Sequence, residues 1–225
     1  MRVNNLREER GEPLNLSMHD EEVRRFWNEL ASLSVSDQEA IGSPKSGQFS
    51  TIAMPEGLEN RVILDIGCGY GRYAVPLAKR NEVIGIDVSR AMLQRLKRNS
   101  RSVASIIADA KHLPFIDETF DAIISIATLY YIDKWEFAIY EIARVLKLNG
   151  LAILDFRGYS IYNILREITL RSLKMLGCSR PWRYGLRHRL TIRRYVRRVL
   201  SYSKLKVLTE TGKRIRFQIE ATKSR

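Results

Sequence analysis

Short apolar runs separated by amphipathic segments dominate the middle of the chain. Each run is five to seven residues long and rich in Val and Ile, and the segments between the runs have helical periodicity. This alternation predicts an α/β fold in which helices cover both faces of a mostly parallel sheet. The predicted strands are 62–66, 82–87, 105–109, 120–126 and 151–156. The predicted helices are 72–80, one that begins at Ser89, and 135–148, which ends at a stop signal, Asn149-Gly150.

The two flanks of this region follow other patterns. Residues 19–34 have an apolar face at helical spacing, so they predict an amphipathic helix with Asp20 as its cap. After residue 156 the strand–helix alternation stops, and residues 160–176 and 191–200 predict two further helices. Residues 204–209 and 214–221 predict two strands of a hairpin with Gly212 in the turn.

The charge of the chain is concentrated near its end. Lys and Arg number 38 against 25 Asp and Glu, which gives a formal net charge of +13. Residues 1–150 hold 19 basic and 21 acidic side chains, whereas residues 151–225 hold 19 basic and 4 acidic ones. No acidic residue occurs from 180 to 198. This asymmetry indicates an anionic partner: nucleic acid, an anionic membrane surface or an acidic substrate.

Other features of composition narrow the class of protein. The two cysteines, Cys68 and Cys178, are too few for a disulfide framework or a Cys-rich zinc module, so no metal site is predicted. They suit a reducing cytoplasm. The first residues lack the apolar core of a signal peptide, and the most apolar run, 122–132, is too short to span a bilayer. We therefore expect a cytoplasmic protein, with peripheral membrane contact as an open alternative.

A glycine-rich loop, Gly67-x-Gly69-x-Gly71, follows the first predicted strand. In a doubly wound sheet such a loop lies where ligands bind, because it follows the carboxyl end of a strand near the switch point. A nicotinamide site requires a third glycine at the position of Arg72. Asp65, just before the loop, would repel a pyrophosphate but suits a cationic amine. Asp87 ends the next strand and is placed to bind a ribose diol.

These residues carry a family resemblance. Five segments resemble, in order and at proper spacing, the motifs of class I S-adenosylmethionine-dependent methyltransferases, within the broad subfamily that includes the ubiquinone- and menaquinone-type enzymes. The segments are residues 62–71, 83–93, 108–115, 120–125 and 141–151.

The resemblance implies a Rossmann-like, doubly wound, seven-stranded and mostly parallel sheet with an antiparallel last strand, N-terminal helices and a helical insertion after strand five. We expect one domain overall, composed of four parts. These are an N-terminal tail with cap helices (1–60), a cofactor-binding core (61–156), a basic helical insertion or substrate lid (157–203) and a C-terminal hairpin that completes the sheet (204–225).

The resemblance also implies roles for single residues. The loop Gly67, Cys68, Gly69 and Gly71 would pack against the methionine part of S-adenosylmethionine, with Asp65 near its amino group. Asp87 would bind the ribose, Val88 and Met92 would flank the adenine, and Asp109 with the Ala110 backbone would bind its edge. Residues from Ser125 through Ala127 to Thr128 would line the methionine end. For Asp65 and Asp87 the alternative role is capping of the neighbouring loop and helix.

The methyl acceptor and the catalytic groups are less defined. Tyr130 and Tyr131 occupy positions where relatives place residues that face the substrate, and packing under the sheet is the alternative. The apolar segment 160–176 beside a basic one favours an apolar or lipid-like small molecule with an anionic group. The rival acceptor is RNA, since residues 124–131 are similar to tRNA wobble-uridine carboxymethyl methyltransferases, which have two His in place of these tyrosines. A partner subunit without catalysis is a third alternative, and the oligomeric state is open.

Overall fold

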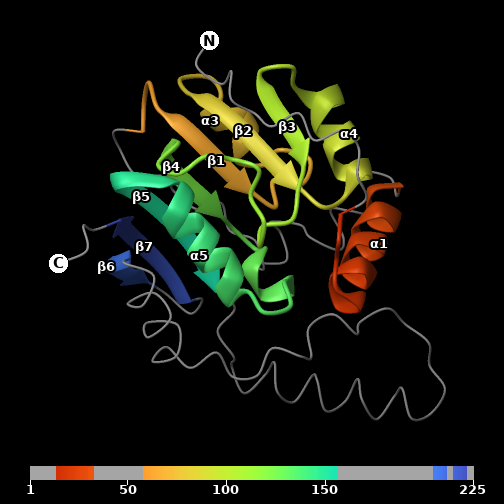
Figure 1. Cartoon of the computed structure of the whole chain (residues 1–225). Coiled ribbons are helices and arrows are strands. Elements are labelled where there is room, and N and C mark those ends of the chain that lie inside the picture. Colours follow the sequence, from red (N-terminus) through yellow and green to blue (C-terminus); the bar gives the residue numbers. More distant parts are fainter. Residues whose placement is uncertain (1–13, 33–57, 157–204, 212–214, 222–225) are drawn as a thin grey trace.

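The computed structural model describes residues 14–32, 58–156, 205–211 and 215–221. Its centre is one sheet with the strand order β3-β2-β1-β4-β5-β7-β6 (Figure 1). The first five strands are β1 (Val62–Ile66), β2 (Glu82–Asp87), β3 (Val103–Ile107), β4 (Phe120–Ser125) and β5 (Leu146–Phe156), and all four pairings among them are parallel. The predicted doubly wound, mostly parallel sheet is confirmed for these strands.

Helices cover both faces of the sheet. On one face, α5 (Glu136–Val145) buries Ile139 and Ile142 in a cluster that includes Leu64 of β1. On the other face, α3 (Ala74–Leu77) and α4 (Arg90–Asn99) pack Leu77 and Leu96 in a second cluster. Strands with apolar side chains on both faces need this two-sided cover, which explains their continuous Val/Ile runs.

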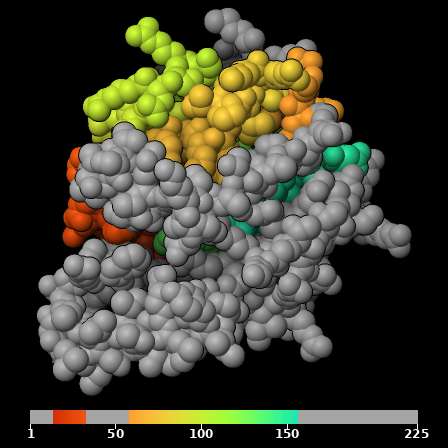
Figure 2. Space-filling view, turned by 180° about the vertical axis from the view of Figure 1, so that it is seen from behind, coloured from red at the N-terminus to blue at the C-terminus, as the bar shows by residue number. Residues whose placement is uncertain are grey.

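Helix α1 (Met18–Ser32) lies beside α4, as the views from both sides show (Figures 1 and 2). The Asn28 side-chain oxygen accepts hydrogen bonds from the Ser89 hydroxyl (2.7 Å) and the Ala91 amide (3.3 Å) at the start of α4. The predicted cap was wrong: the Ser17 hydroxyl, not Asp20, accepts an amide of the first turn, that of Asp20 itself, at 3.2 Å. The Asp20 side chain is therefore available for contacts outside the helix.

Three predicted boundaries differ from the structure. The predicted helix 72–80 is only the four-residue α3, because Pro76 lacks an amide and the next turns tighten, with Lys79 donating to the Pro76 carbonyl. β3 ends at Ile107 rather than at 109, since Asp109 turns back and accepts the Lys111 amide at 2.9 Å.

The third difference is at the end of α5. This helix ends at Val145, where the amides of Glu118 and Thr119 donate hydrogen bonds to the carbonyl oxygens of Arg144 and Val145. With these acceptors used by a neighbouring segment, the chain continues as β5 from Leu146 instead of as helix to 148. The residues before Leu151 then form an irregular stretch of the β4–β5 pairing.

Two more strands are described by their backbone. β6 (Leu205–Thr211) pairs antiparallel with β7 (Ile215–Ala221), and β7 pairs antiparallel with β5. The predicted helices 160–176 and 191–200, the Arg-rich stretch 180–198, the hairpin turn at Gly212 and Cys178 lie outside the described residues. Within the described ranges, no helix has the length and apolar character that crossing a bilayer requires.

Candidate cofactor site

The switch point of the sheet lies between β1 and β4. From β1 the chain moves outward through β2 to β3, and then returns to the other side of β1 with β4. The residues after β1 and β4 meet there, and the Thr128 hydroxyl lies 3.5 Å from the Gly67 carbonyl oxygen. In doubly wound sheets, ligands bind in the crevice at such a point.

The glycine loop is shaped by close packing on one side and open space on the other. Gly67 and Gly69 have φ angles of 71° and 54°. A Cβ atom at Gly67 would lie 2.1 Å from Oγ1 of Thr128, so any side chain there must clash. A Cβ atom at Gly69 would meet nothing within 4 Å. The loop therefore exposes its backbone at Gly69, where a ligand can approach.

Asp87 joins the glycine loop to the start of α4. Its Oδ2 accepts the Gly69 amide at 3.0 Å, and its Oδ1 accepts the Ser89 amide at 2.8 Å. The capping role weighed as an alternative is thus present. The two hydrogen bonds still leave acceptor positions of the Asp87 carboxylate unused, because an ionised carboxylate has about four of them. Burial raises the pKa of Asp87 to about 6, against the lowering effect of these backbone hydrogen bonds.

Asp65 is buried at 2% exposure near the end of β1. The Ala74 amide donates to this carboxylate, but its Oδ2 has no hydrogen-bond partner among the described residues. Burial raises the pKa of Asp65 to about 7, and the nearby negative charge of Asp87 adds to the rise. Two carboxylates close together, of which Asp65 is buried, form a site that favours a cation or several hydrogen-bond donors.

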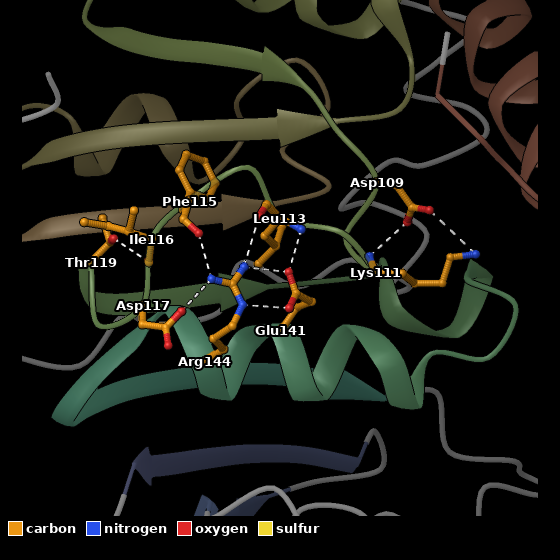
Figure 3. A network of polar contacts seen from close by, with 9 residues as sticks. All are labelled: Asp109, Lys111, Leu113, Phe115, Ile116, Asp117, Thr119, Glu141 and Arg144. Carbon is orange, nitrogen blue, oxygen red and sulfur yellow. Dashed lines mark hydrogen bonds and ion pairs between the residues drawn. The ribbon is translucent and has the colours of Figure 1, made fainter. Parts of the chain in front are cut away.

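A third carboxylate follows β3. Asp109 accepts the Lys111 amide on Oδ1, while its buried Oδ2 accepts no hydrogen bond from a described residue. Two nitrogen atoms lie near that oxygen, Nζ of Lys111 at 3.7 Å and Nδ1 of the exposed His112 at 3.5 Å. Figure 3 shows Lys111 reaching back toward Asp109. The carboxyl ends of β1, β2 and β3 thus each contribute a carboxylate, and two of these retain a buried oxygen without a donor.

Other predicted residues lie near this edge but serve packing. Cys68 and Met92 are 6% and 3% exposed, and burial raises the pKa of the Cys68 thiol. The Cys68 sulfur lies in the core, where a Cβ atom at Gly85 would come within 2.7 Å of it. Ser125 is fully buried, with its hydroxyl donating to the Ile66 carbonyl at 3.4 Å. Ala110 also packs in the core, and Val88 is partly exposed beside Asp87.

The two tyrosines form a short 3₁₀ turn, η2 (Leu129–Tyr131), directly after β4. Their ring centroids are 4.5 Å apart, and Tyr130 is buried. The Tyr131 ring also meets Trp27 of α1 edge-on at 5.6 Å, and its carbonyl oxygen lies 3.1 Å from Nε2 of His19. Both tyrosines therefore contribute to the packing around α1, and Tyr131 is the more accessible of the two.

The structure adds residues that sequence reasoning missed. Asp20 and Lys111 were not predicted to take part in the site, yet their ion pair joins α1 to the loop after β3 at the carboxyl edge of the sheet. Ala127 has a φ of 58°, a strained conformation for alanine at the end of β4. The apolar face of residues 19–34 was the only signal for α1, and it gave no indication of which loops the helix contacts.

The arrangement fits a ligand that presents a cationic amine, a diol and a second amine to successive strand ends. Asp65, with its buried oxygen that lacks a partner among the described residues, suits the cation, and the backbone at Gly69 is open to a ligand. No group of three His, Cys, Asp or Glu residues in the described ranges is arranged to hold a metal ion.

Comparison with known proteins agrees with this chemistry. The methyltransferase domain family matches residues 64–154. A malonyl-[acyl-carrier protein] O-methyltransferase from Hamiltonella defensa is 29% identical over 119 residues, which cover 52% of this chain and 46% of that protein. A tRNA (carboxymethyluridine(34)-5-O)-methyltransferase from Arabidopsis thaliana is 35% identical over 114 residues, 49% of this chain and 26% of that protein. The chain thus spans less than half the length of either relative.

A solved structure supports the fold along most of the chain. An S-adenosyl-L-methionine-dependent methyltransferase from Methanococcus maripaludis superposes with a TM-score of 0.55 at 19% identity, covering 96% of this chain and 99% of that one. Residues 64–154 therefore match the methyltransferase domain family, and the chain has the fold of solved S-adenosyl-L-methionine-dependent methyltransferases.

Proposed function

We propose that this chain binds S-adenosylmethionine along the carboxyl ends of β1, β2 and β3 and transfers its methyl group to a small-molecule acceptor. The observation that carries the proposal is the row of three acidic side chains near the open side of Gly69: Asp65 and Asp109, which are buried, and Asp87, which is partly exposed. In this proposal Asp65 holds the amino group, Asp87 the ribose hydroxyls and Asp109 the adenine amine. The Gly67–Gly71 backbone and residues 125–128 face the methionine part, while Val88, Met92 and the Ala110 backbone contact the adenine.

The cofactor supplies a methyl group on a sulfonium, which is a good leaving group. The protein therefore contributes mainly position and desolvation. The glycine loop and the Thr128 contact fix the edge of β1 against that of β4, and the three carboxylates fix the cofactor along this edge. Tyr131, just after β4 and partly exposed, is the better placed of the two tyrosines to contact an acceptor.

We further propose that the acceptor is an apolar or lipid-like molecule with an anionic group. The support comes from the sequence: the apolar segment 160–176 and the acid-free stretch 180–198 both connect β5 to β6, and a connection from the end of β5 emerges at the cofactor edge. The malonyl relative is consistent with an acidic acceptor. In one domain, the C-terminal hairpin 204–225 would complete a seven-stranded sheet, residues 1–60 would form a tail with cap helices, and the basic insertion 157–203 would form the substrate lid.

Transfer of a labelled methyl group by the full chain tests the proposal. Prenylated phenol carboxylates in vesicles and tRNA that carries carboxymethyluridine serve as acceptors. The control is Asp65→Asn, whose transfer rate at subsaturating cofactor should fall about tenfold. Labelling of neither acceptor class, together with binding of the cofactor, would favour the non-catalytic partner subunit.

RNA is the second candidate acceptor, because one relative is named for a tRNA uridine modification and the last third of the chain is basic. Affinity for RNA should fall steeply with salt, since each neutralised phosphate releases counterions. Affinity for a lipid-like acceptor should persist at high salt. Replacing Arg193, Arg194, Arg197 and Arg198 with Glu should raise KM for either acceptor, and an unchanged KM would assign these side chains to a solvated face.

A cytoplasmic location, with or without peripheral contact to a membrane, is part of the same proposal. The basic stretch and the apolar segment would together serve a membrane surface as well as a lipid-like acceptor. Sedimentation with anionic and neutral vesicles distinguishes the two locations, because only the anionic vesicles should retain a basic peripheral protein.

A further inference from the structure

Helix α1 is remote in sequence from the cofactor loops but contacts three of them. Asn28 binds the start of α4 after β2, and Asp20 binds Lys111 in the loop after β3. The second oxygen of Asp20 accepts the Asp133 amide at 3.0 Å in the segment after β4. These loops carry the residues proposed to hold the cofactor, so α1 can influence their geometry directly.

Lys111 lies between two carboxylates. The exposed fractions of the Lys111, Asp20 and Asp109 side chains are 10%, 9% and 8%. The ammonium forms a close ion pair with Oδ2 of Asp20 but remains 3.7 Å from Oδ2 of Asp109, beyond hydrogen-bond distance. Asp20 also receives the Ser17 hydroxyl at 2.8 Å, so donors from three segments converge on it.

The position of this ammonium decides whether Asp109 can bind a ligand. Oδ2 of Asp109 is buried without a hydrogen bond from any described residue, while the Lys111 ammonium is paired with Asp20 of α1. Without the negative charge of Asp20, Asp109 would be the nearest carboxylate, and the flexible lysine stem would let the ammonium reach it. A charge-assisted hydrogen bond would then occupy the free oxygen. The other nitrogen near Oδ2 of Asp109, Nδ1 of the exposed His112, lies 3.5 Å from it.

We propose that Asp20 is a positioning residue of the cofactor site: by holding Lys111 on α1, it keeps Oδ2 of Asp109 free for the 6-amino group of the adenine. This inference rests on the proposed function. It assigns to the N-terminal helix a specific task in adenine recognition, carried out by a residue that does not touch the cofactor.

Calorimetry with two ligands tests the inference in the full chain. The ligands are S-adenosylhomocysteine and its purine analogue that lacks the 6-amino group, and their affinity ratio measures the contact with Asp109. A hydrogen bond to a charged acceptor predicts a ratio of about tenfold or more in the wild-type protein. Asp20→Asn should reduce the ratio to about threefold or less, because the ammonium then fills the acceptor.

Three more variants separate positioning from general stability. The double variant Asp20→Asn with Lys111→Met should recover about the wild-type ratio, since no ammonium competes for Asp109 and residue 20 no longer carries an unpaired charge. Lys111→Met alone should keep the ratio even if thermal unfolding shows a less stable protein. Glu21→Gln is the matched control, because Glu21 is the neighbouring acid in the same helix and pairs with Arg24. This substitution should leave the affinity ratio unchanged.

The outcomes are distinguishable. A wild-type ratio in Asp20→Asn, or a low ratio in the double variant, would overturn the inference. If Asp20→Asn does not fold, Lys111→Met provides the test instead. An affinity ratio of the two ligands below about threefold in that variant would overturn the inference. A wild-type protein that binds S-adenosylhomocysteine without discriminating the analogue overturns the inference but leaves the proposed function intact. A wild-type protein that binds neither ligand overturns the proposed function itself.

Discussion

Arg144 and Glu141, one turn apart on α5, form a two-point ion pair, with Nε to Oε1 at 2.8 Å and Nη2 to Oε2 at 2.7 Å (Figure 3). The guanidinium also donates to the carbonyl oxygens of Phe115 (2.7 Å) and Leu113 (3.0 Å), and Oε2 of Glu141 accepts the Leu113 amide at 2.7 Å. The pair raises the pKa of Arg144 and lowers that of Glu141. It therefore clamps the loop that carries Asp109 to α5.

Replacing Arg144 with Lys should destabilise the protein by about 2 kcal/mol, because one ammonium cannot reproduce the fork that reaches a carboxylate and two carbonyls. Denaturant unfolding measures the change. Arg80→Lys is the matched control, since Arg80 pairs with Glu59 on the surface with side-chain exposures of 72% and 54%. That substitution should cost less than about 0.5 kcal/mol. Equal effects at the two sites would show that the clamp adds no stability.

Alanine substitutions at two glycines of the same loop should have different main effects: Gly67→Ala should mainly lower stability, and Gly69→Ala should mainly lower cofactor affinity. Gly67→Ala places a methyl group 2.1 Å from Thr128 Oγ1, so we expect a loss of about 2–4 kcal/mol of stability. Gly69→Ala meets open space, so its cost is that of a positive φ, about 1 kcal/mol. The new methyl group would project into the proposed ligand space and lower cofactor affinity at least about tenfold. Thermal unfolding and calorimetry on both variants separate the effects, and full cofactor affinity in Gly69→Ala would contradict the proposed approach.

Buried Asp65 should make stability and cofactor binding respond to pH in opposite directions. Its pKa of about 7, against an ordinary 3.8, means that the folded state binds more protons than the unfolded chain between these values. The free energy of unfolding should therefore fall as pH rises through this window. The cationic amine of the cofactor favours the ionised carboxylate, so affinity should rise with pH through about 7, with proton release.

Asp65→Asn should remove the larger part of both pH effects and leave the part due to Asp87. It should also stabilise the ligand-free protein near pH 8, because a desolvated charge is gone, while cofactor affinity falls about tenfold. Unfolding and calorimetry from pH 5.5 to 8 test this. A variant as pH-dependent as the wild type would show that Asp65 is not the group that titrates.

The core of the fold was predictable because its signals are local. Continuous Val/Ile runs and the Gly67–Gly71 loop specify buried strands and the turn after β1. In the structure, four of the five predicted core strands, β1 to β4, begin within two residues of their predicted starts. The early start of β5 and the end of α5 depend on Glu118 and Thr119 donating to the carbonyls of Arg144 and Val145. These partners are 26 residues apart in sequence, so no local pattern of the helix indicates them.

The site was predictable to a similar degree. Asp65, Asp87 and Asp109 follow from motif positions, and the structure places each at or beside a strand end. Asp20 and Lys111 do not follow from motifs, since their pairing spans 91 residues and depends on where α1 docks. Similarly, Cys68 looked like part of the ligand loop, but its direction into the core is set by the absence of a side chain at Gly85.

Asp87 carries the central claim, because it links the Gly69 amide to the start of α4 at the point proposed for the ribose. The most direct measurement is titration calorimetry of the full chain with S-adenosylhomocysteine, using Asp87→Ala for comparison and a nicotinamide dinucleotide as the competing ligand class. We predict a micromolar dissociation constant for the wild-type protein, a loss of about 1–3 kcal/mol of binding free energy in the variant, and no binding of the dinucleotide. Absence of S-adenosylhomocysteine binding, or tight binding of the dinucleotide, would contradict the account.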